Sequence, residues 1–283
     1  MKTLSQKYFI GLAQWHHPEW YPDLADKRAA LPRYAEHFSS VEGNNTFYGL
    51  PAPSTLQQWH EETPSTFRFC LKFPKRITHE LKLRHCDEEV QNFLVHAAQL
   101  KEKVGILWLQ MSHQFAPSDL PSLAKLLSQL PQEFSYGIEV RHLNFFNKSD
   151  EERAFNRLLL ERGINRVAFD TRTLFAHPMP DAVTQEALRA KPRVPLHVIA
   201  TGQHPMVRFI TPLDYQLASS ALDQWVNKAK AWIEEGKTPY FFFHTPNNER
   251  APQLAIEFAQ RLAELEPTCA PLKAWTTPQP ELF

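Results

Sequence analysis

The stretch from Phe67 to Phe73 reads FRFCLKF, so that large apolar residues alternate with arginine, cysteine and lysine. Side chains along a β-strand point to opposite faces in turn, and the pattern therefore predicts a strand with one apolar face. The other face carries Arg68, Cys70 and Lys72. An open sheet covered by helices on both faces favours continuous apolar runs, whereas a closed barrel accepts charges at the carboxyl ends of its strands. The alternation thus favours a barrel.

Two further stretches repeat this arrangement. GIEVR, from Gly137 to Arg141, places a glutamate and an arginine on one face and apolar residues on the other. SVEGNNTFYGLP, from Ser40 to Pro51, runs from a short strand into a loop rich in polar side chains. Glu42 then points inward, opposite or beside Lys72. We expect such side chains from several strands to meet at one mouth of the barrel.

Short runs rich in β-branched and aromatic residues recur eight times, which is the number of strands in a (β/α)8 barrel. They are Phe9–Ala13, Ser40–Asn44, Phe67–Phe73, Ile106–Gln110, Gly137–Arg141, Arg166–Asp170, Val207–Ile210 and Tyr240–His244. Helix-like stretches lie between them, at Pro53–Glu62, Asp87–Glu102, Ser118–Gln129, Asp150–Glu161, Asp214–Glu235 and Arg250–Leu265. This alternation predicts an α/β fold: a single (β/α)8 TIM-barrel-like domain over residues 1–266, with an extended, proline-containing tail over residues 267–283.

The interval from residue 171 to residue 206 is ambiguous. Its segment Pro192–Ile199 reads either as an extra strand or as an excursion between two barrel strands. Its role stays open at this point.

Composition excludes several functional classes. The chain of 283 residues is 43% hydrophobic and 22% charged, as in ordinary globular proteins. Its 31 Lys+Arg balance 31 Asp+Glu, so we expect no global basic surface for nucleic acid, and direct nucleic-acid binding stays open only for a local patch. Neither GxGxxG nor GxxxxGK[ST] occurs among only 8 glycines, and we therefore predict no cofactor.

The three cysteines, Cys70, Cys86 and Cys269, are widely spaced and form no CxxC pair. This argues against a disulfide framework or a zinc ribbon, and it indicates a reducing compartment, so we predict a cytoplasmic protein. No apolar run approaches the roughly 20 residues that a membrane span needs. The apolar run that starts at Tyr8 is too short for the core of a signal peptide.

Several motifs follow one another in a recognisable order: Gly11-x-x-x-Trp15, Phe38-x-x-Val41-Glu42-x-Asn44-x-Thr46-Phe47-Tyr48-x-x-Pro51, Trp59, Phe69-x-x-Lys72-x-Pro74-x-x-Ile77-Thr78-His79 and Glu139-x-Arg141. Together they resemble the YecE-like family of uncharacterised bacterial proteins, over nearly the whole chain. The resemblance implies a single TIM-barrel-like domain. It implies no established activity.

In such a barrel, charged side chains at the strand ends converge on one cavity. We expect a catalytic set of Glu42 and Glu139 as general acid and base, Lys72 as the group that sets their proton affinity, and His79. The side chains expected to bind substrate are Trp15, Asn44, Thr46, Tyr48, Arg141, Asp170, Arg208 and Asn247. The two arginines would clamp an anion through paired donors, which suits a small polar or phosphorylated compound.

Other interpretations of these residues stay open. The same acids and bases would also form ion pairs that line a binding barrel without catalysis. A glycosidase would need two carboxyls roughly 5 or 6.5–9.5 Å apart, for which Glu42 and Glu139 are candidates. A metal site would need clustered ligands, but no HxH, HExxH or Cys/His spacing occurs, and we predict none.

The residues from Gln279 to Phe283 read QPELF, which resembles the Gln-x-x-Leu-Phe peptides by which bacterial replication and repair proteins bind the sliding clamp. Leu282 and Phe283 would enter an apolar groove while Gln279 is hydrogen-bonded. The alternative is a tail without a partner. Clamp tethering would raise the local concentration at DNA and relax the need for strong direct binding.

We therefore predict that the protein handles a small polar or anionic ligand at the carboxyl end of the barrel. It acts there either as an acid–base enzyme, a hydrolase or an isomerase, or as a ligand-binding barrel. The alternative is a nucleic-acid-associated phosphodiesterase or repair factor recruited to the sliding clamp. The reaction, the substrate and the oligomeric state stay open.

Overall fold

The structure is a computed structural model that describes residues 6–22, 24, 26 and 29–275. Within these ranges eight parallel strands form one sheet in the order β1-β8-β7-β6-β5-β4-β3-β2. They are β1 (Phe9–Leu12), β2 (Ser40–Gly43), β3 (Arg68–Lys72), β4 (Val104–Gln110), β5 (Ser135–Glu139), β6 (Asn165–Asp170), β7 (Met206–Ile210) and β8 (Tyr240–His244). Each predicted strand is confirmed, with ends that differ by at most two residues.

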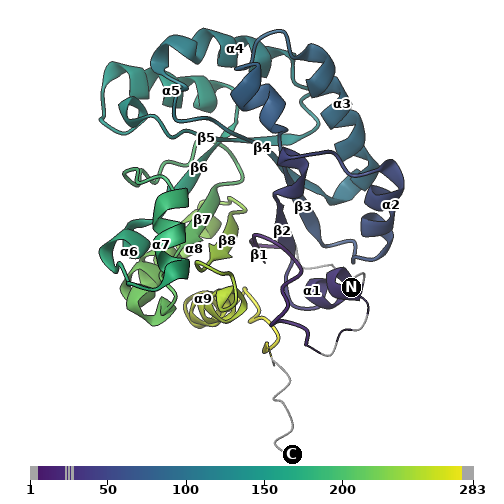
Figure 1. Cartoon of the computed structure of the whole chain (residues 1–283), viewed down its shortest axis with the longest axis vertical. Coiled ribbons are helices and arrows are strands. Elements are labelled where there is room, and N and C mark those ends of the chain that lie inside the picture. Colours follow the sequence, from purple (N-terminus) through teal and green to yellow (C-terminus); the bar gives the residue numbers. More distant parts are fainter. Residues whose placement is uncertain (1–5, 23, 25, 27–28, 276–283) are drawn as a thin grey trace, which may run out of the picture.

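Helices lie between the strands and cover the outside of the sheet. They are α1 (Ala30–Ala35), α2 (Pro53–Glu61), α3 (Asp87–Ala97), α4 (Leu120–Gln129), α5 (Asp150–Glu161), α6 (Arg172–Ala176), α7 (Ala182–Ala190), α8 (Ser219–Glu234) and α9 (Ala251–Leu265). Figure 1 shows α2 to α5 outside β3 to β6, and α8 and α9 on the side of β7 and β8. The predicted TIM-barrel-like α/β fold is confirmed. In the described ranges, no helix has both the length and the apolar character that a membrane span requires.

The predicted helix over Asp87–Glu102 is shorter in the structure. The α-helix ends at Ala97, and a 3-10 turn continues over Ala98–Lys103. Lys101 has φ 50° and ψ −128°, which no α-helix accommodates.

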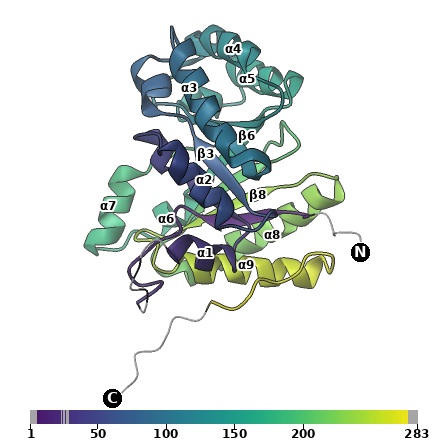
Figure 2. The ribbon, with the colours of Figure 1, turned by 90° about the vertical axis from the view of Figure 1, so that its right-hand side faces the viewer.

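The ambiguous interval between β6 and β7 holds α6 and α7, followed by a long loop. Figure 2 shows α7 at the left edge of the molecule, outside the layers of α2 to α5 and of α8 and α9. Pro192–Ile199 forms no strand, so the excursion is the correct interpretation. Pro192 and Pro195 explain this, because proline has no N–H group for a sheet ladder. The excursion brings Lys191 to the carboxyl end of the barrel.

The strand register shows which side chains face the interior. The amino-terminal half is filled by an apolar cluster of Phe9, Cys70, Ile106, Trp108, Val167, Met206, Tyr240 and Phe242. Gln110 pairs with Glu139 at the carboxyl ends of β4 and β5, and Arg208 lies beside Phe242 and two residues beyond Met206, so the polar side chains adjoin this cluster on its carboxyl-terminal side. The polar side chains therefore lie where the sequence pattern predicts them.

The seam between β1 and β2 closes the barrel without a regular ladder. The Tyr34 hydroxyl accepts the Leu12 N–H at 2.8 Å and donates to the Ser40 carbonyl oxygen at 2.8 Å. The Ser39 N–H also donates to the Ile10 carbonyl oxygen at 3.1 Å. Gly11 permits this approach, because a Cβ there would lie 2.0 Å from the Ser40 carbonyl oxygen. One buried hydroxyl thus joins the first and second strands.

The described part of the predicted tail packs against the barrel. Residues 267–275 form no helix or strand, but Cys269 is buried and the Trp275 ring lies 5.6 Å from Phe38 and 5.9 Å from Trp20. Burial of the large indole explains the docking. Gln279, Leu282 and Phe283 lie outside the described residues.

Replacing Tyr34 by phenylalanine should destabilise the fold by about 2–4 kcal/mol, because a buried N–H and a buried carbonyl lose their partner together. Urea unfolding followed by circular dichroism measures the change. The matched control is Tyr48→Phe, since Tyr48 is 84% exposed; its effect should stay within about 0.5 kcal/mol. Equal effects of the two variants would contradict the proposed seam.

Candidate functional site

Arg208, on β7, lies at the centre of the interior and bridges two glutamates from other strands. Its Nε and one Nη donate to the two carboxylate oxygens of Glu42 on β2, each at 2.8 Å. The other Nη donates to Glu139 on β5 at 2.7 Å. All three side chains are buried. The planar guanidinium matches the two-oxygen geometry of a carboxylate, so both acids are held by charge-assisted hydrogen bonds.

Each carboxylate also has a second partner. Glu42 accepts from Asn44 Nδ2 at 2.7 Å and lies 3.1 Å from His244 Nε2. Glu139 accepts from Arg141 Nε at 2.9 Å. Burial acts to raise the pKa of both carboxyl groups, but Arg208, together with His244 at Glu42 and Arg141 at Glu139, outweighs it and holds both pKa values below the usual range. Both acids are therefore ionised at neutral pH.

Lys72 has a different environment from the one expected. We predicted that it lies opposite or beside Glu42 and could neutralise it, but the register pairs Glu42 with Cys70, and Arg208 occupies the carboxylate. The Lys72 ammonium instead donates to Gln110 Oε1 at 2.8 Å and lies 3.8 Å from the Phe47 ring centroid. No carboxylate among the described residues forms an ion pair with it.

Burial, together with the positive charge of Arg208, lowers the pKa of Lys72 to about 7. The Thr46 hydroxyl fixes the Lys72 backbone, since it donates to the carbonyl oxygen at 2.7 Å and accepts the N–H at 3.1 Å. Lys72 is therefore a rigidly held amine that is part neutral at physiological pH.

A cavity of about 380 Å³ opens above this layer. Its polar lining comes from all eight strand ends or the loops that follow them, and consists of Gln14, Asn44, Asn45, Tyr48, Lys72, Gln110, Arg141, Lys191, Arg208, His244 and Asn248. The Lys191 side chain makes no hydrogen bond or ion pair to any described residue. Burial and the charge of Arg208 lower its pKa. Within the described part of the chain, the cavity thus presents a cation without a partner.

The structure brings together most of the predicted site residues. Lys72, Asn44, Tyr48, Arg141 and Arg208 line the cavity. Glu42 and Glu139 lie beneath it as the partners of Arg208, and Thr46 supports Lys72 from behind.

Four predicted residues lie elsewhere. Asp170 points out of the barrel, where it pairs with Arg172 at 3.0 Å and accepts from Trp225 Nε1 at 2.9 Å. The reason is strand parity: Phe169 is the residue paired with Arg208, so its neighbour faces the helices. Trp15 packs edge-on against Trp59 at 4.8 Å.

Asn247 is one residue away from the cavity and bonds to Glu249, while Asn248 takes the lining position. His79 packs edge-on against Phe47 at 5.2 Å and lies 2.8 Å from the Thr78 hydroxyl. Burial and the charge of Arg141 lower the pKa of His79 to about 4, so its ring is neutral at physiological pH.

Sequence reasoning did not assign Gln14, Gln110, Lys191, His244 or Asn248 to the site. The alternation pattern could have identified Gln110, because it is the last residue of β4 and points to the same side as the inward-facing residues of that strand. Lys191 carried no such signal, since it follows α7 in the interval that lacks strand periodicity.

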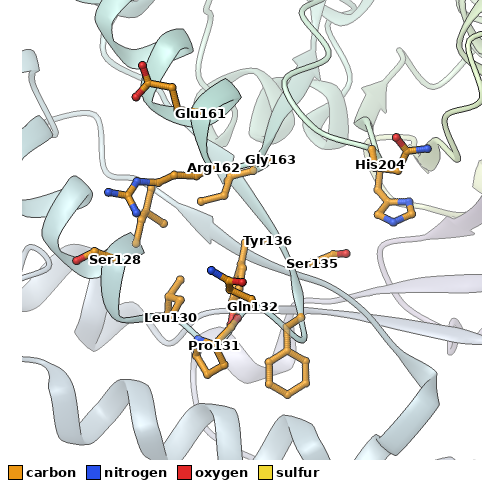
Figure 3. Close-up of a pocket in the computed structure, with 14 residues that line it drawn as sticks. Ser128, Leu130, Pro131, Gln132, Ser135, Tyr136, Glu161, Arg162, Gly163 and His204 are labelled. Carbon is orange, nitrogen blue, oxygen red and sulfur yellow. The ribbon is translucent and has the colours of Figure 1, made fainter.

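A larger hollow of about 570 Å³ lies at the other end of the barrel, where β5, β6 and β7 begin. Figure 3 shows its lining, including Ser135, Tyr136 and His204. The Tyr136 hydroxyl donates to the Pro131 carbonyl oxygen, and His204 Nδ1 lies 3.3 Å from the Thr238 carbonyl oxygen. These polar groups hold local backbone, as is usual at the amino-terminal face of such a barrel.

The described residues contain no group of three or more His, Cys, Asp or Glu side chains arranged to hold a metal ion. His244 and Glu42 are the nearest approach in the mouth, and Arg208 shares that carboxylate. The donor set therefore suits an anion better than a cation.

The fold and the site define a class: a parallel (β/α)8 barrel with a polar, cation-rich mouth at the carboxyl ends of its strands. Residues 9–280 match the model of a protein family of unknown function, DUF72, and the chain belongs to this family. This confirms the YecE-like resemblance.

Among the relatives, "UPF0759 protein YecE" of Escherichia coli strain K12 is 43% identical over 246 residues, which are 87% of this chain and 89% of the relative. "UPF0759 protein YunF" of Bacillus subtilis is 35% identical over 71 residues, 25% of each chain. Similar crystal structures of DUF72 family proteins come from Thermotoga maritima (TM-score 0.67, 20% identity, 91% of this chain and 98% of that one) and Enterococcus faecalis (0.65, 19%, 91% and 96%). These structures support the fold alone.

Replacing Arg208 by methionine should destabilise the protein by about 3–5 kcal/mol, because two buried carboxylates lose their main partner. In the native protein both carboxyl pKa values lie below the ordinary value of 4.5, so their ion pairs stabilise the fold above that pH and lose this effect as the pH falls. In the variant, burial is opposed only by the remaining partners, Asn44 and His244 at Glu42 and Arg141 at Glu139, so the same pKa values rise. The destabilisation should therefore be larger at pH 8 than at pH 5, as measured by urea unfolding.

The control is Arg153→Met on the outside of the barrel. The Arg153 side chain is 63% exposed and that of its partner Asp150 is 93% exposed, so the cost should be below about 1 kcal/mol. An Arg208→Met effect that is equal at both pH values would contradict the ionised state of the two glutamates.

Proposed function

We propose that the protein is an acid–base enzyme that binds a small anionic compound in the mouth of the barrel and uses Lys72 to transfer a proton. The observation that carries the proposal is the mismatch of charge around the cavity. Four cationic side chains line it, namely Lys72, Arg141, Lys191 and Arg208, whereas two carboxylates lie beneath it, and both are already paired. With both lysines protonated, four minus two leaves two positive charges for a ligand.

The partners of the two carboxylates bear on the type of reaction. A hydrolase that uses two carboxyl groups needs one of them protonated and the other free. Glu42 and Glu139 share one guanidinium and have lowered pKa values, so neither is suited to donate a proton. Of the two reaction classes expected from the sequence, an isomerase is therefore better supported.

Lys72 fits the role of the proton-transfer group. A general acid or base works best with a pKa near the working pH, and the pKa of Lys72 is lowered to about 7. The amine lies at the base of the cavity, where Gln110 and the Thr46 contacts fix its position. The exposed ring of Tyr48 stands at the rim, where it offers a face for stacking.

Thermal denaturation tests the anion site. Inorganic phosphate, pyruvate and dihydroxyacetone phosphate should raise the melting temperature by roughly 3 °C at ten times their Kd, at constant ionic strength, because they bind only the folded state. Lys191→Met should weaken binding about tenfold, since a charge-assisted contact contributes about 1.5 kcal/mol.

The matched control is Lys125→Met, on the exposed face of α4, which should bind like the native protein. Glucose, a neutral compound of similar size, should give no shift. A shift that survives Lys191→Met unchanged, or that a short DNA duplex alone produces, would contradict this site.

We also propose, from the sequence motif, that Gln279, Leu282 and Phe283 bind the bacterial sliding clamp. This requires a cytoplasmic protein, which the three free and buried cysteines support. Trp275 packs against the barrel, so the motif begins only a few residues along the chain from a residue that is held on the barrel. Immobilised purified clamp should retain the full chain and lose a chain without Leu282 and Phe283. Equal retention of the two chains would exclude the proposal.

A further inference from the structure

We propose that Lys72 forms a covalent imine with a small aldehyde or ketone that carries a carboxylate or phosphate group. The inference rests on the proposed anion site and names its substrate class. It concerns the amine as a nucleophile, in addition to its role as a proton carrier.

The surroundings of Lys72 differ from those of an ordinary buried lysine. Its Nζ contacts the neutral oxygen of Gln110 at 2.8 Å, and the ring centroids of Phe47 and Trp108 lie 3.8 Å and 5.2 Å away. The two nearby carboxylates are occupied by Arg208 and Arg141. A buried amine without a carboxylate partner and beside other cations is the usual arrangement of a nucleophilic lysine.

Two effects act on the proton of this amine in opposite directions. The aromatic faces of Phe47 and Trp108 favour the ammonium form. Burial and the positive charge of Arg208 favour the neutral form and prevail, so that the pKa of Lys72 is lowered to about 7. A large fraction of Lys72 is thus available to attack a carbonyl carbon at neutral pH.

The other cations in the cavity select the substrate. Lys191 and Arg141 line the same cavity as Lys72, and Lys191 has no partner among the described residues. A carboxylate or phosphate held between them would leave the remainder of a small ligand over the base of the cavity, where Lys72 lies. A volume of about 380 Å³ admits a compound of this size together with water.

The reaction needs no oxidant or reductant. The nitrogen lone pair of Lys72 forms a bond to the carbonyl carbon, the carbonyl π pair moves to the oxygen, and the nitrogen loses one proton while the oxygen gains one. A proton from solvent then lets the oxygen leave as water, while the nitrogen lone pair forms the C=N bond and leaves the imine protonated. The protonated imine withdraws electrons from the adjacent carbon, which makes its C–H bond easier to break and links this step to proton transfer.

Reductive trapping tests the imine. The full-length protein is incubated with pyruvate or with dihydroxyacetone phosphate, treated with sodium borohydride, digested and analysed by mass spectrometry. Either compound should give one adduct at Lys72, at least tenfold more abundant than at the exposed Lys75, three residues along the chain. An adduct from pyruvate alone assigns a carboxylate substrate, and one from the phosphate alone assigns a phosphate substrate; both outcomes support the imine.

Matched variants and conditions sharpen the result. Lys72→Met should lose the adduct, while Lys75→Met should be labelled like the native protein. Lactate and glycerol 3-phosphate, which lack the carbonyl, should give none. With cyanoborohydride present throughout, the initial rate at Lys72 should rise with pH up to about 7 and then level off, whereas labelling of an ordinary lysine rises towards pH 10.

Labelling spread evenly over the exposed lysines, or undiminished in Lys72→Met, would overturn the imine. Absence of any adduct, in protein whose melting temperature still rises with the same two compounds, would overturn the imine and leave the anion site in place. Absence of both the adduct and the thermal shift would overturn the proposed function as well.

Discussion

The bridge from Arg208 to Glu42 and Glu139 determines how the mouth of this barrel is built. Three charged side chains are buried where the strands converge, and each would be costly alone. Because one guanidinium satisfies two carboxylates, the polar layer is stable next to an apolar one that contains Trp108 and Phe242. Both acids are thereby held ionised, and neither forms an ion pair with the nearby Lys72.

This arrangement sets the chemistry of Lys72. In a barrel with one acid for each base, a carboxylate would hold the lysine proton and keep its pKa high. Here Arg208 and Arg141 occupy the carboxylates, and the amine is left with Gln110 and two aromatic faces. A structural ion-pair network and a reactive lysine are therefore compatible descriptions of this site. The network occupies both carboxylates, and this leaves Lys72 without an acidic partner. The open cavity above them distinguishes the mouth from a closed, purely structural core.

The strands were predictable because their signal is local. Alternation with a period of two, as in Phe67–Phe73, reports directly on which side chains face inward, and it indicated the inward direction of Glu42, Lys72 and Glu139. Parity also explains the position of Asp170. We had expected this residue in the mouth because it lies at the end of its strand, but its side chain faces the helices. The excursion between β6 and β7 lacked periodicity, and its two prolines alone could not specify its helices. Nothing in the sequence therefore indicated that Lys191 lines the cavity.

The sequence by itself thus determined the barrel, the end that carries the polar groups, and the family. It could not determine which charges pair, because that depends on contacts between residues far apart along the chain: Arg208 and Glu42 are separated by 166 positions, and Arg208 and Glu139 by 69. Only the tertiary structure decided that Arg208, and not Lys72, neutralises Glu42. The physical reason is geometric, since a long forked guanidinium reaches across the interior and meets both carboxylates, whereas the lysine on β3 ends against Phe47 and Gln110.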